Sequence, residues 1–208
     1  KPGGFSRGAG HGSTFTDKFN NYWHISTSII CVKNTWERRM GIWPTGFDKD
    51  DVMWCNTAFG DYPLYLPSAV QPNVFRPEWF LLFYKKAVTV SSTLGSYYSN
   101  NTVDESIKTY WSAATANKGE WIQTDLGAVS TVNAVQINYA DQDVEFLGKQ
   151  TTTYHQYKLY YSLDGKKWTV LVDKSSNKTD VPHDYVELEK PVQAKFIKLE
   201  NIHMPTGK

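Results

Sequence analysis

The stretch that decides the fold runs from Thr109 to Gly127 and reads TYWSAATANKGEWIQTDLG. Two tryptophans, Trp111 and Trp121, flank a small, polar loop that contains a glycine. After Trp121 the residues are apolar, polar, polar, acidic and apolar, and the chain then reaches Gly127. This pattern predicts a short strand that stops at Gly127, because glycine takes positive φ without a steric penalty.

A second motif follows downstream, where residues 161–168 read YSLDGKKW. It predicts a strand, an Asp-Gly turn and a returning strand. A tryptophan after a polar loop, then WIQTDLG, then YSLDGKKW, resembles the discoidin family of coagulation-factor type C domains, which includes family 32 carbohydrate-binding modules. The resemblance begins near Ala87 and implies a jelly-roll β-sandwich over residues 86–208 that lacks its last strand. Its strands are expected at residues 88–91, 121–126, 132–139, 157–162, 168–172, 185–188 and 195–199.

Composition describes an ordinary globular chain of 208 residues, with 40% hydrophobic and 21% charged residues and a net charge of +1. Lysines and arginines are scattered, so neither nucleic acid nor an anionic membrane is an expected partner. The apolar runs are too short to span a bilayer. Cys31 and Cys55 are too few for a disulfide framework or a metal site. The chain starts with Lys1 and shows no signal peptide, so we expect a piece of a longer or processed polypeptide.

The first half alternates short β patterns with turns and shows no helical period. Residues 22–30 and 38–43 predict strands, the second ended by Pro44. Residues 46–51 predict a turn, from which residues 52–56 return. Such spacing favours a sandwich, a barrel or a propeller.

Three segments of this half, GAGHG at residues 8–12, YWH at 22–24 and ERR at 37–39, resemble the end of a family 43 glycoside hydrolase. That family is a five-bladed β-propeller whose members remove arabinose, xylose or galactose units. The resemblance covers residues 1–85 and implies about the last two blades, with the other blades upstream in the parent chain. The family's catalytic acids belong to those earlier blades, so no catalytic residue is assigned here. Asp51 departs from the family, which commonly has glycine there.

Between the two regions, three prolines within residues 67–77 predict an extended connector. The apolar residues 79–84 predict a last strand that packs on the first unit. The complete expectation is an all-β chain, with a partial β-propeller followed by a discoidin-like sandwich.

The resemblance to the hydrolases implies two substrate-pocket residues in the first unit. The histidine matching His11 lies near the active site, often beside a calcium ion, and an arginine matching Arg38 reaches the substrate. Both positions also suit surface roles, a loop histidine with a backbone partner and a solvated arginine. Glu37 has no second carboxylate near it in the sequence, so we expect it at the surface.

Residues 104–109 resemble the loop that binds a structural calcium in discoidin-like modules. Asp104 and Thr109 would supply side-chain oxygens and Ser106 a carbonyl, which suits a cation that prefers oxygen ligands. Glu105 stands where the family usually has glycine.

Sugar contacts in such modules lie in loops at one end of the barrel, where an aromatic ring can stack on the apolar C–H face of a pyranose. Trp111 and Trp121 carry the family motif and are expected in the core. The candidate contacts are loop residues, with His183 behind them: Tyr97, Tyr98, Phe146, Tyr154 and His155.

The resemblances together imply the C-terminal part of a secreted glycoside hydrolase, extracellular, periplasmic or at the cell surface, with a module that binds polysaccharide. This part alone is expected to be inactive, because it lacks a pair of catalytic carboxyls. The alternative is a non-catalytic adhesion module for glycans or proteins. A third possibility is a rigid spacer without a ligand.

Overall fold

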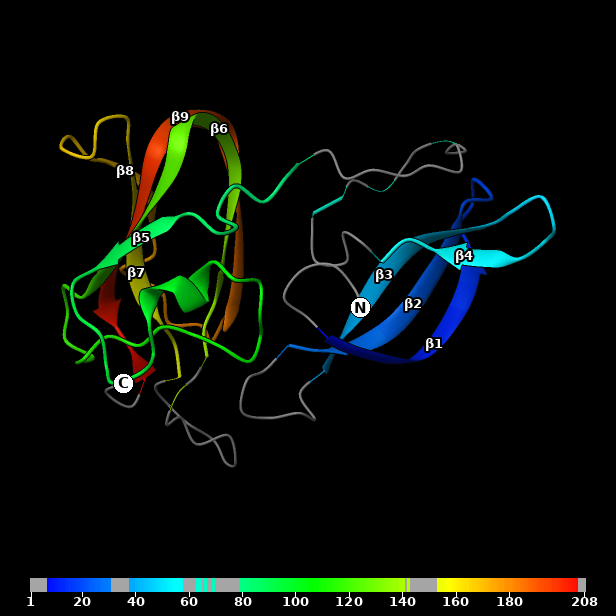
Figure 1. Ribbon diagram of the computed structural model, residues 1–208, viewed down its shortest axis with the longest axis horizontal. Helices are drawn as coiled ribbons and strands as arrows, with labels where there is room; N and C mark the ends of the chain where they lie inside the picture. The colour runs from blue at the N-terminus through cyan, green and yellow to red at the C-terminus, as the bar shows by residue number, and fades with distance from the viewer. Residues whose placement is uncertain are drawn as a thin grey trace. The chain divides into compact units, whose positions relative to one another are not determined.

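The structure is a computed structural model that describes residues 7–30, 38–57, 63–64, 66, 69, 79–140, 142 and 153–205. Its contacts divide the chain into two compact units (Figure 1). The first comprises residues 1–81 with 105–108, and the second comprises residues 82–104 and 109–208. Within the described ranges, no helix is long and apolar enough to cross a membrane.

The first unit contains a four-stranded antiparallel sheet in which neighbours along the chain are neighbours in space. Trp23 and Trp43 are buried on opposite faces, since Trp43 pairs with His24 in the register and side chains alternate along a strand. The strands predicted at residues 22–30 and 52–56 are present, and the described residues form this one sheet. Its strands are β1 (Arg7–Thr16), β2 (Tyr22–Ile29), β3 (Arg38–Phe47) and β4 (Met53–Cys55).

The strand that was predicted to end at Pro44 continues to Phe47. Proline lacks an N–H, but its carbonyl can still serve a neighbouring segment. Pro44 pairs with Trp23 on one side, and on the other its carbonyl accepts a hydrogen bond from the Asn56 N–H at 2.9 Å. The expected strand end at Pro44 is therefore wrong, because the hydrogen bond to Asn56 needs only the carbonyl acceptor of Pro44 and not an N–H donor.

The second unit contains a five-stranded sheet in the order β5-β6-β9-β7-β8. The strands predicted at residues 88–91, 157–162 and 168–172 are confirmed within one residue at each end. The Asp-Gly turn is confirmed as well: Gly165 has φ +73, and Asp164 accepts the N–H groups of Lys166 and Lys167. The elements are β5 (Ala87–Val90), η1 (Ser99–Thr102), β6 (Trp121–Asn138), β7 (Gln156–Ser162), β8 (Thr169–Asp173) and β9 (His183–His203).

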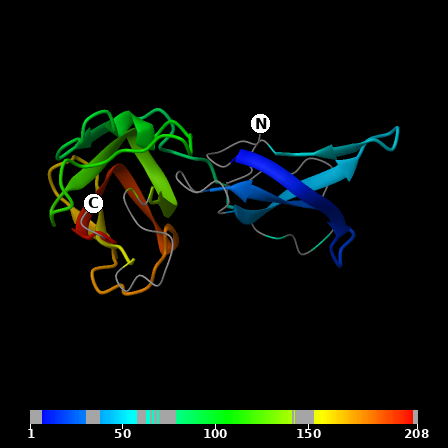
Figure 2. The same ribbon diagram turned by 90° about the horizontal axis from the view of Figure 1, so that it is seen from below.

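The two longest strands, β6 and β9, each replace two predicted short ones (Figures 1 and 2). They pair with one another along most of their length, with register shifts between Asp125 and Ser130 and between Val132 and Ala134. Gly127 has φ +85 and lies within the first shift, so it bends the strand and does not end it. The prediction of positive φ at Gly127 is confirmed, while the prediction of a strand end there is wrong.

The core of the second unit forms where alternate residues of β6, β7 and β9 face inward. Trp111 and Trp121 are only partly buried and lie outside this core cluster, contrary to expectation. Trp111 needs a partner for its indole N–H, which it donates to the Ser92 carbonyl at 3.1 Å. The cluster consists of Leu126, Val132, Val135, Tyr157, Leu159, Ala194 and Ile197.

Residues 79–84 form no strand, and two of them do not pack as predicted. Leu82 and Phe83 lie against the core cluster of the second unit. The Lys86 N–H donates to the Phe83 carbonyl at 3.0 Å, so the chain turns into β5 immediately after them. The apolar side chains of Leu82 and Phe83 thus belong to the second unit and not to the first.

Candidate functional site

One end of the second unit gathers four segments: residues 91–104 together with 109–120, and residues 153–155, 174–182 and 201–205 (Figure 1). Asn201, which is buried at the end of β9, holds the longest of these loops. Its N–H donates to the Glu120 carbonyl at 2.8 Å, and its side-chain amide donates to Ala116 at 3.2 Å and Asn117 at 3.1 Å. We call these four segments the loop end.

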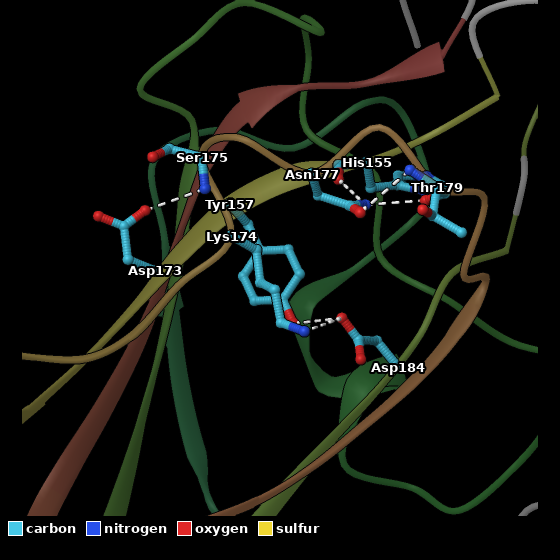
Figure 3. Close-up of polar contacts among 8 residues, drawn as sticks. All are labelled: His155, Tyr157, Asp173, Lys174, Ser175, Asn177, Thr179 and Asp184. Atoms are coloured by element: carbon cyan, nitrogen blue, oxygen red, sulfur yellow. Dashed lines mark hydrogen bonds and ion pairs between the residues drawn. The ribbon is translucent and has the colours of Figure 1, made fainter.

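Asn177 fixes two more of the segments (Figure 3). Its side-chain amide donates to the carbonyls of His155 at 2.9 Å and Thr179 at 2.8 Å. Its own carbonyl accepts from the side chain of Gln156 at 2.8 Å. Because each bond crosses between backbone and side chain, the loop end has a defined shape in the absence of any ligand.

His155 was predicted to contact sugar, but the structure places it inside the unit. It is 3% exposed and stacks on Tyr139, with ring centroids 3.6 Å apart and planes inclined by 12°. Burial, with a smaller contribution from His203, lowers the pKa of His155 to about 4, so its ring is neutral at pH 7. We therefore correct its role from ligand contact to support for the loop end.

Below the loops, Tyr157 and Asp184 form a buried polar pair. The Tyr157 hydroxyl donates to the Asp184 carboxylate at 2.7 Å, and the Lys174 ammonium lies 3.9 Å from the same oxygen (Figure 3). Burial, the hydrogen bond and the carboxylate charge all raise the pKa of Tyr157. The tyrosine therefore stays protonated and serves as a fixed donor to Asp184.

The exposed rings of the loop end are those of tyrosines. Tyr98 is 62% exposed immediately before η1. Tyr97 is half-buried and stacks on Tyr110 at 4.7 Å, so one of its faces is already covered. Tyr154 is half-buried, and its ring centroid lies 4.7 Å from that of His203. Among the predicted contacts, Tyr98 and Tyr154 thus offer a ring at this end, whereas Phe146 lies outside the described residues.

Glu120 is a feature of the loop end that the sequence did not indicate. Its carboxylate accepts hydrogen bonds from Ser91, from Ser92 at 2.8 Å and from Thr115 at 2.7 Å. Burial acts to raise its pKa, but the three hydroxyls outweigh that effect and lower it. Its position directly before Trp121 is the only signal in the sequence, because two of its three partners, Ser91 and Ser92, are distant along the chain.

The predicted calcium loop brings a carboxylate and a hydroxyl together. Thr109 donates to the Asp104 carboxylate at 2.7 Å, and the Ser106 hydroxyl accepts from the Lys108 N–H at 3.3 Å. Glu105 has φ +56, the left-handed region that explains why the family usually has glycine there. In the part of the chain that the structure describes, no three His, Cys, Asp or Glu side chains cluster as a metal site would require. A cation here would therefore depend on hydroxyl and carbonyl oxygens beside Asp104.

The two predicted residues of the first unit lie on different strands, on either side of β2. His11 is exposed with φ +52 in an irregular part of β1, between the pairs Gly10–Thr27 and Ser13–Ile25. Arg38 begins β3 opposite Ile29, the last residue of β2. No cross-strand pair joins the two in the described register, and Glu37 lies outside the described residues. His183 of the second unit pairs with Asn138, at 3.0 Å from its side-chain oxygen.

The F5/8 type C domain profile matches residues 87–207, more than half of the chain. The chain belongs to this family. The F5/8 type C domain so defined contains β5 to β9 and the complete loop end. A search among curated proteins found no match.

Solved structures with the same fold include chitosan-binding modules of a chitosanase/glucanase from Paenibacillus sp. IK-5. Module 1 is 23% identical, with a TM-score of 0.50, over 61% of this chain and 90% of the module. Module 2, solved in complex with chitotriose, is 22% identical, with a TM-score of 0.51, over the same shares. At this identity the likeness establishes the discoidin-like fold of the F5/8 type C domain.

Proposed function

We propose that the F5/8 type C domain binds carbohydrate at its loop end, through the rings of Tyr98 and Tyr154. The observation that carries the proposal is the exposed Tyr98 ring on a hydrogen-bonded loop, in which the Asn101 N–H donates to the Tyr98 carbonyl at 3.1 Å and the Ser112 N–H to the Tyr97 carbonyl at 3.3 Å. A ring face can stack on the C–H face of a sugar, and a loop ordered in advance loses little entropy when it binds. A neighbour of the same fold was solved with chitotriose bound, which supports this class of ligand.

The direct test is to titrate the intact chain with a panel of oligosaccharides that includes chitotriose, followed by calorimetry. Tyr98→Ala and Tyr154→Ala should each weaken binding about tenfold or more, as expected when an aromatic contact is lost. Tyr22→Ala is the matched control, because Tyr22 is 42% exposed on β2, outside the F5/8 type C domain. Unchanged binding in both loop variants would refute the site.

The finer proposal is that this domain serves a secreted glycoside hydrolase that acts on arabinose-, xylose- or galactose-containing polysaccharide. The first unit supports it by forming a four-stranded antiparallel sheet, the repeating element of a propeller blade. The domain would hold the enzyme against its polymer and raise the local substrate concentration. The parent chain should then hydrolyse aryl arabinofuranosides, xylosides or galactosides, whereas residues 1–208 alone should not. Turnover by residues 1–208 would contradict this assignment.

A non-catalytic adhesion module is the second candidate, because the hydrolase proposal takes its catalytic acids from blades upstream and the described residues do not supply one. Glycosidases need a carboxylic acid whose pKa is raised. In the described part of the chain, the carboxyls whose pKa departs from the ordinary value all move down. Asp17 is the example in the first unit: burial acts to raise its pKa, but hydrogen bonds from Asn21, Trp23 and Phe19 lower it to about 2. Glycan binding without hydrolysis by the parent chain would establish this function.

A further inference from the structure

The outward face of the sheet in the second unit, away from the loop end, carries a cluster of rings and lysines. Tyr160 of β7 stands opposite Lys198 of β9, and Ser162 opposite Phe196, so Tyr160, Phe196 and Lys198 share one face. The Lys198 ammonium lies 5.0 Å from the centre of the Tyr160 ring and 4.7 Å from that of Trp168. All three rings are partly exposed.

Several lysines stand on or beside this face. Lys166 and Lys167 are exposed on the turn before Trp168, and the Lys195 ammonium lies 5.2 Å from the Phe196 ring. Gly165 of the same turn lies against Phe196, which brings the turn lysines to the same end of the sheet. We call the set the basic aromatic patch: Tyr160, Lys166, Lys167, Trp168, Lys195, Phe196 and Lys198.

Among the described residues, four acids lie on or beside this face. Asp125 stands opposite Phe196 and Glu200 stands opposite Lys158, so both share the face of Lys198. Asp164 lies in the turn, but its carboxylate accepts the N–H groups of Lys166 and Lys167 at 2.8 and 2.9 Å. These bonds lower its pKa to about 2, so it stays ionised and faces the backbone. Asp173 is already paired with Lys158 at 2.9 Å. The patch therefore presents more ammonium groups than carboxylates.

We infer that the basic aromatic patch is a second binding site, for an acidic polysaccharide that carries uronate or sulfate groups. Rings offer stacking surfaces for the sugar C–H faces, and the lysines offer charges for its anions. β9, β7 and β8 are neighbours in the sheet, so the patch spans roughly 10 Å across the strands. That width suits a short run of sugar units. The inference goes beyond the loop-end site and does not depend on it.

A nucleic acid is the less suitable polyanion. Its closely spaced phosphates require a long basic stripe, whereas the chain has a net charge of +1. An anionic membrane would also attract lysines, and Leu163, 56% exposed in the adjacent turn, could insert into it. The experiment therefore includes both as competing probes.

The test titrates the intact chain with polygalacturonate, and with the same polymer after methyl esterification, which removes its charge and keeps its sugars. We expect binding to the acidic form only, lost at about 1 M salt, where the screening length falls to about 3 Å. The double variant Lys166→Gln/Lys167→Gln should bind about tenfold more weakly, and Lys198→Gln several-fold more weakly. Lys190→Gln is the control, because it removes the same charge from an exposed position elsewhere on β9.

Trp168→Ala tests the ring contribution, with a melting curve to show that the variant folds. The proposal is overturned if polygalacturonate does not bind, if its esterified form binds equally, or if the lysine variants bind it as tightly as the unsubstituted chain does. Binding of oligo-dT or phosphatidylserine vesicles through these lysines, without binding of polygalacturonate, would also overturn it. Tyr98→Ala should leave polygalacturonate binding intact, so failure of the loop-end site and failure of this patch give different results.

Discussion

His155 makes the stability of the second unit depend on pH. Its pKa is about 4 in the folded chain, against 6.5 for an ordinary histidine, so the unfolded chain binds more protons between these values. The contribution is fully present above pH 6.5 and is lost as pH falls toward 4. The shift corresponds to at most about 3 kcal/mol.

We expect the free energy of unfolding, measured with urea from pH 7 to pH 4, to fall more steeply for the unsubstituted chain of residues 1–208 than for its His155→Phe variant. Aspartates whose pKa is lowered to about 2, such as Asp164 and Asp173, also begin to lose their contribution from about pH 5, where the unfolded chain takes up their protons. They do so equally in both proteins, so the difference between the two profiles reports His155. Parallel pH profiles for the unsubstituted chain and the variant would show that His155 does not cause the pH dependence.

Tyr157 tests the buried pair at the same scale. Tyr157→Phe removes the hydroxyl that donates to Asp184 at 2.7 Å and leaves a buried carboxylate with the more distant Lys174. We expect a loss of about 1.5 to 3 kcal/mol, as for a hydrogen bond to a charged group. Tyr160→Phe, on the outward face of the same strand, is the control and should change stability little. A similar loss in both variants would show that the pair with Asp184 is not the cause.

At the scale of an element, the loop that starts at Asp104 tests the calcium proposal. A cation held by Asp104 and Thr109 would bind the folded chain only and raise its melting temperature. The gain should be about 2.7 kcal/mol when free calcium exceeds the dissociation constant about a hundredfold. Asp104→Asn should abolish the shift, and magnesium serves as the control ion. No shift at millimolar calcium would remove the metal from this loop.

Most strands could be predicted from the sequence, because their cause is local. The alternation of buried and partly exposed side chains from Tyr157 onward, and the Asp-Gly turn at Gly165, both depend on residues adjacent in the sequence. The continuity of β6 and β9 could not be predicted. Gly127 alone indicates the end of a strand, and only the pairing of β6 with β9 on both sides of it shows that the strand continues. Burial of His155 could not be predicted either, because Tyr139 covers it from another strand end. Of the loop-end residues, the sequence indicated the loop tyrosines Tyr98 and Tyr154. It missed Glu120, because two of its partners, Ser91 and Ser92, are far from it along the chain.

For the whole molecule, the apolar residues before β5 decide where the second unit begins. Leu82 and Phe83 pack against its core cluster, so a fragment of residues 82–208 should be more stable than one of residues 87–208. We expect a difference of about 2 kcal/mol, in line with the partial burial of two large side chains. Thermal melting of both fragments measures it. Equal melting temperatures would show that the second unit begins at Ala87.

The order of the strands also has a mechanical consequence. β5 and β9 both run antiparallel to β6 and lie on either side of it. A pull applied to the start of β5 and the end of β9 would act along the strands and shear all of their hydrogen bonds together, instead of peeling them one at a time. A module stretched between a polymer and the rest of its chain, as in flowing liquid, should therefore yield only at high force. In a single-molecule experiment, pulling instead across the sheet, through β5 and β8, should unfold it at a much lower force.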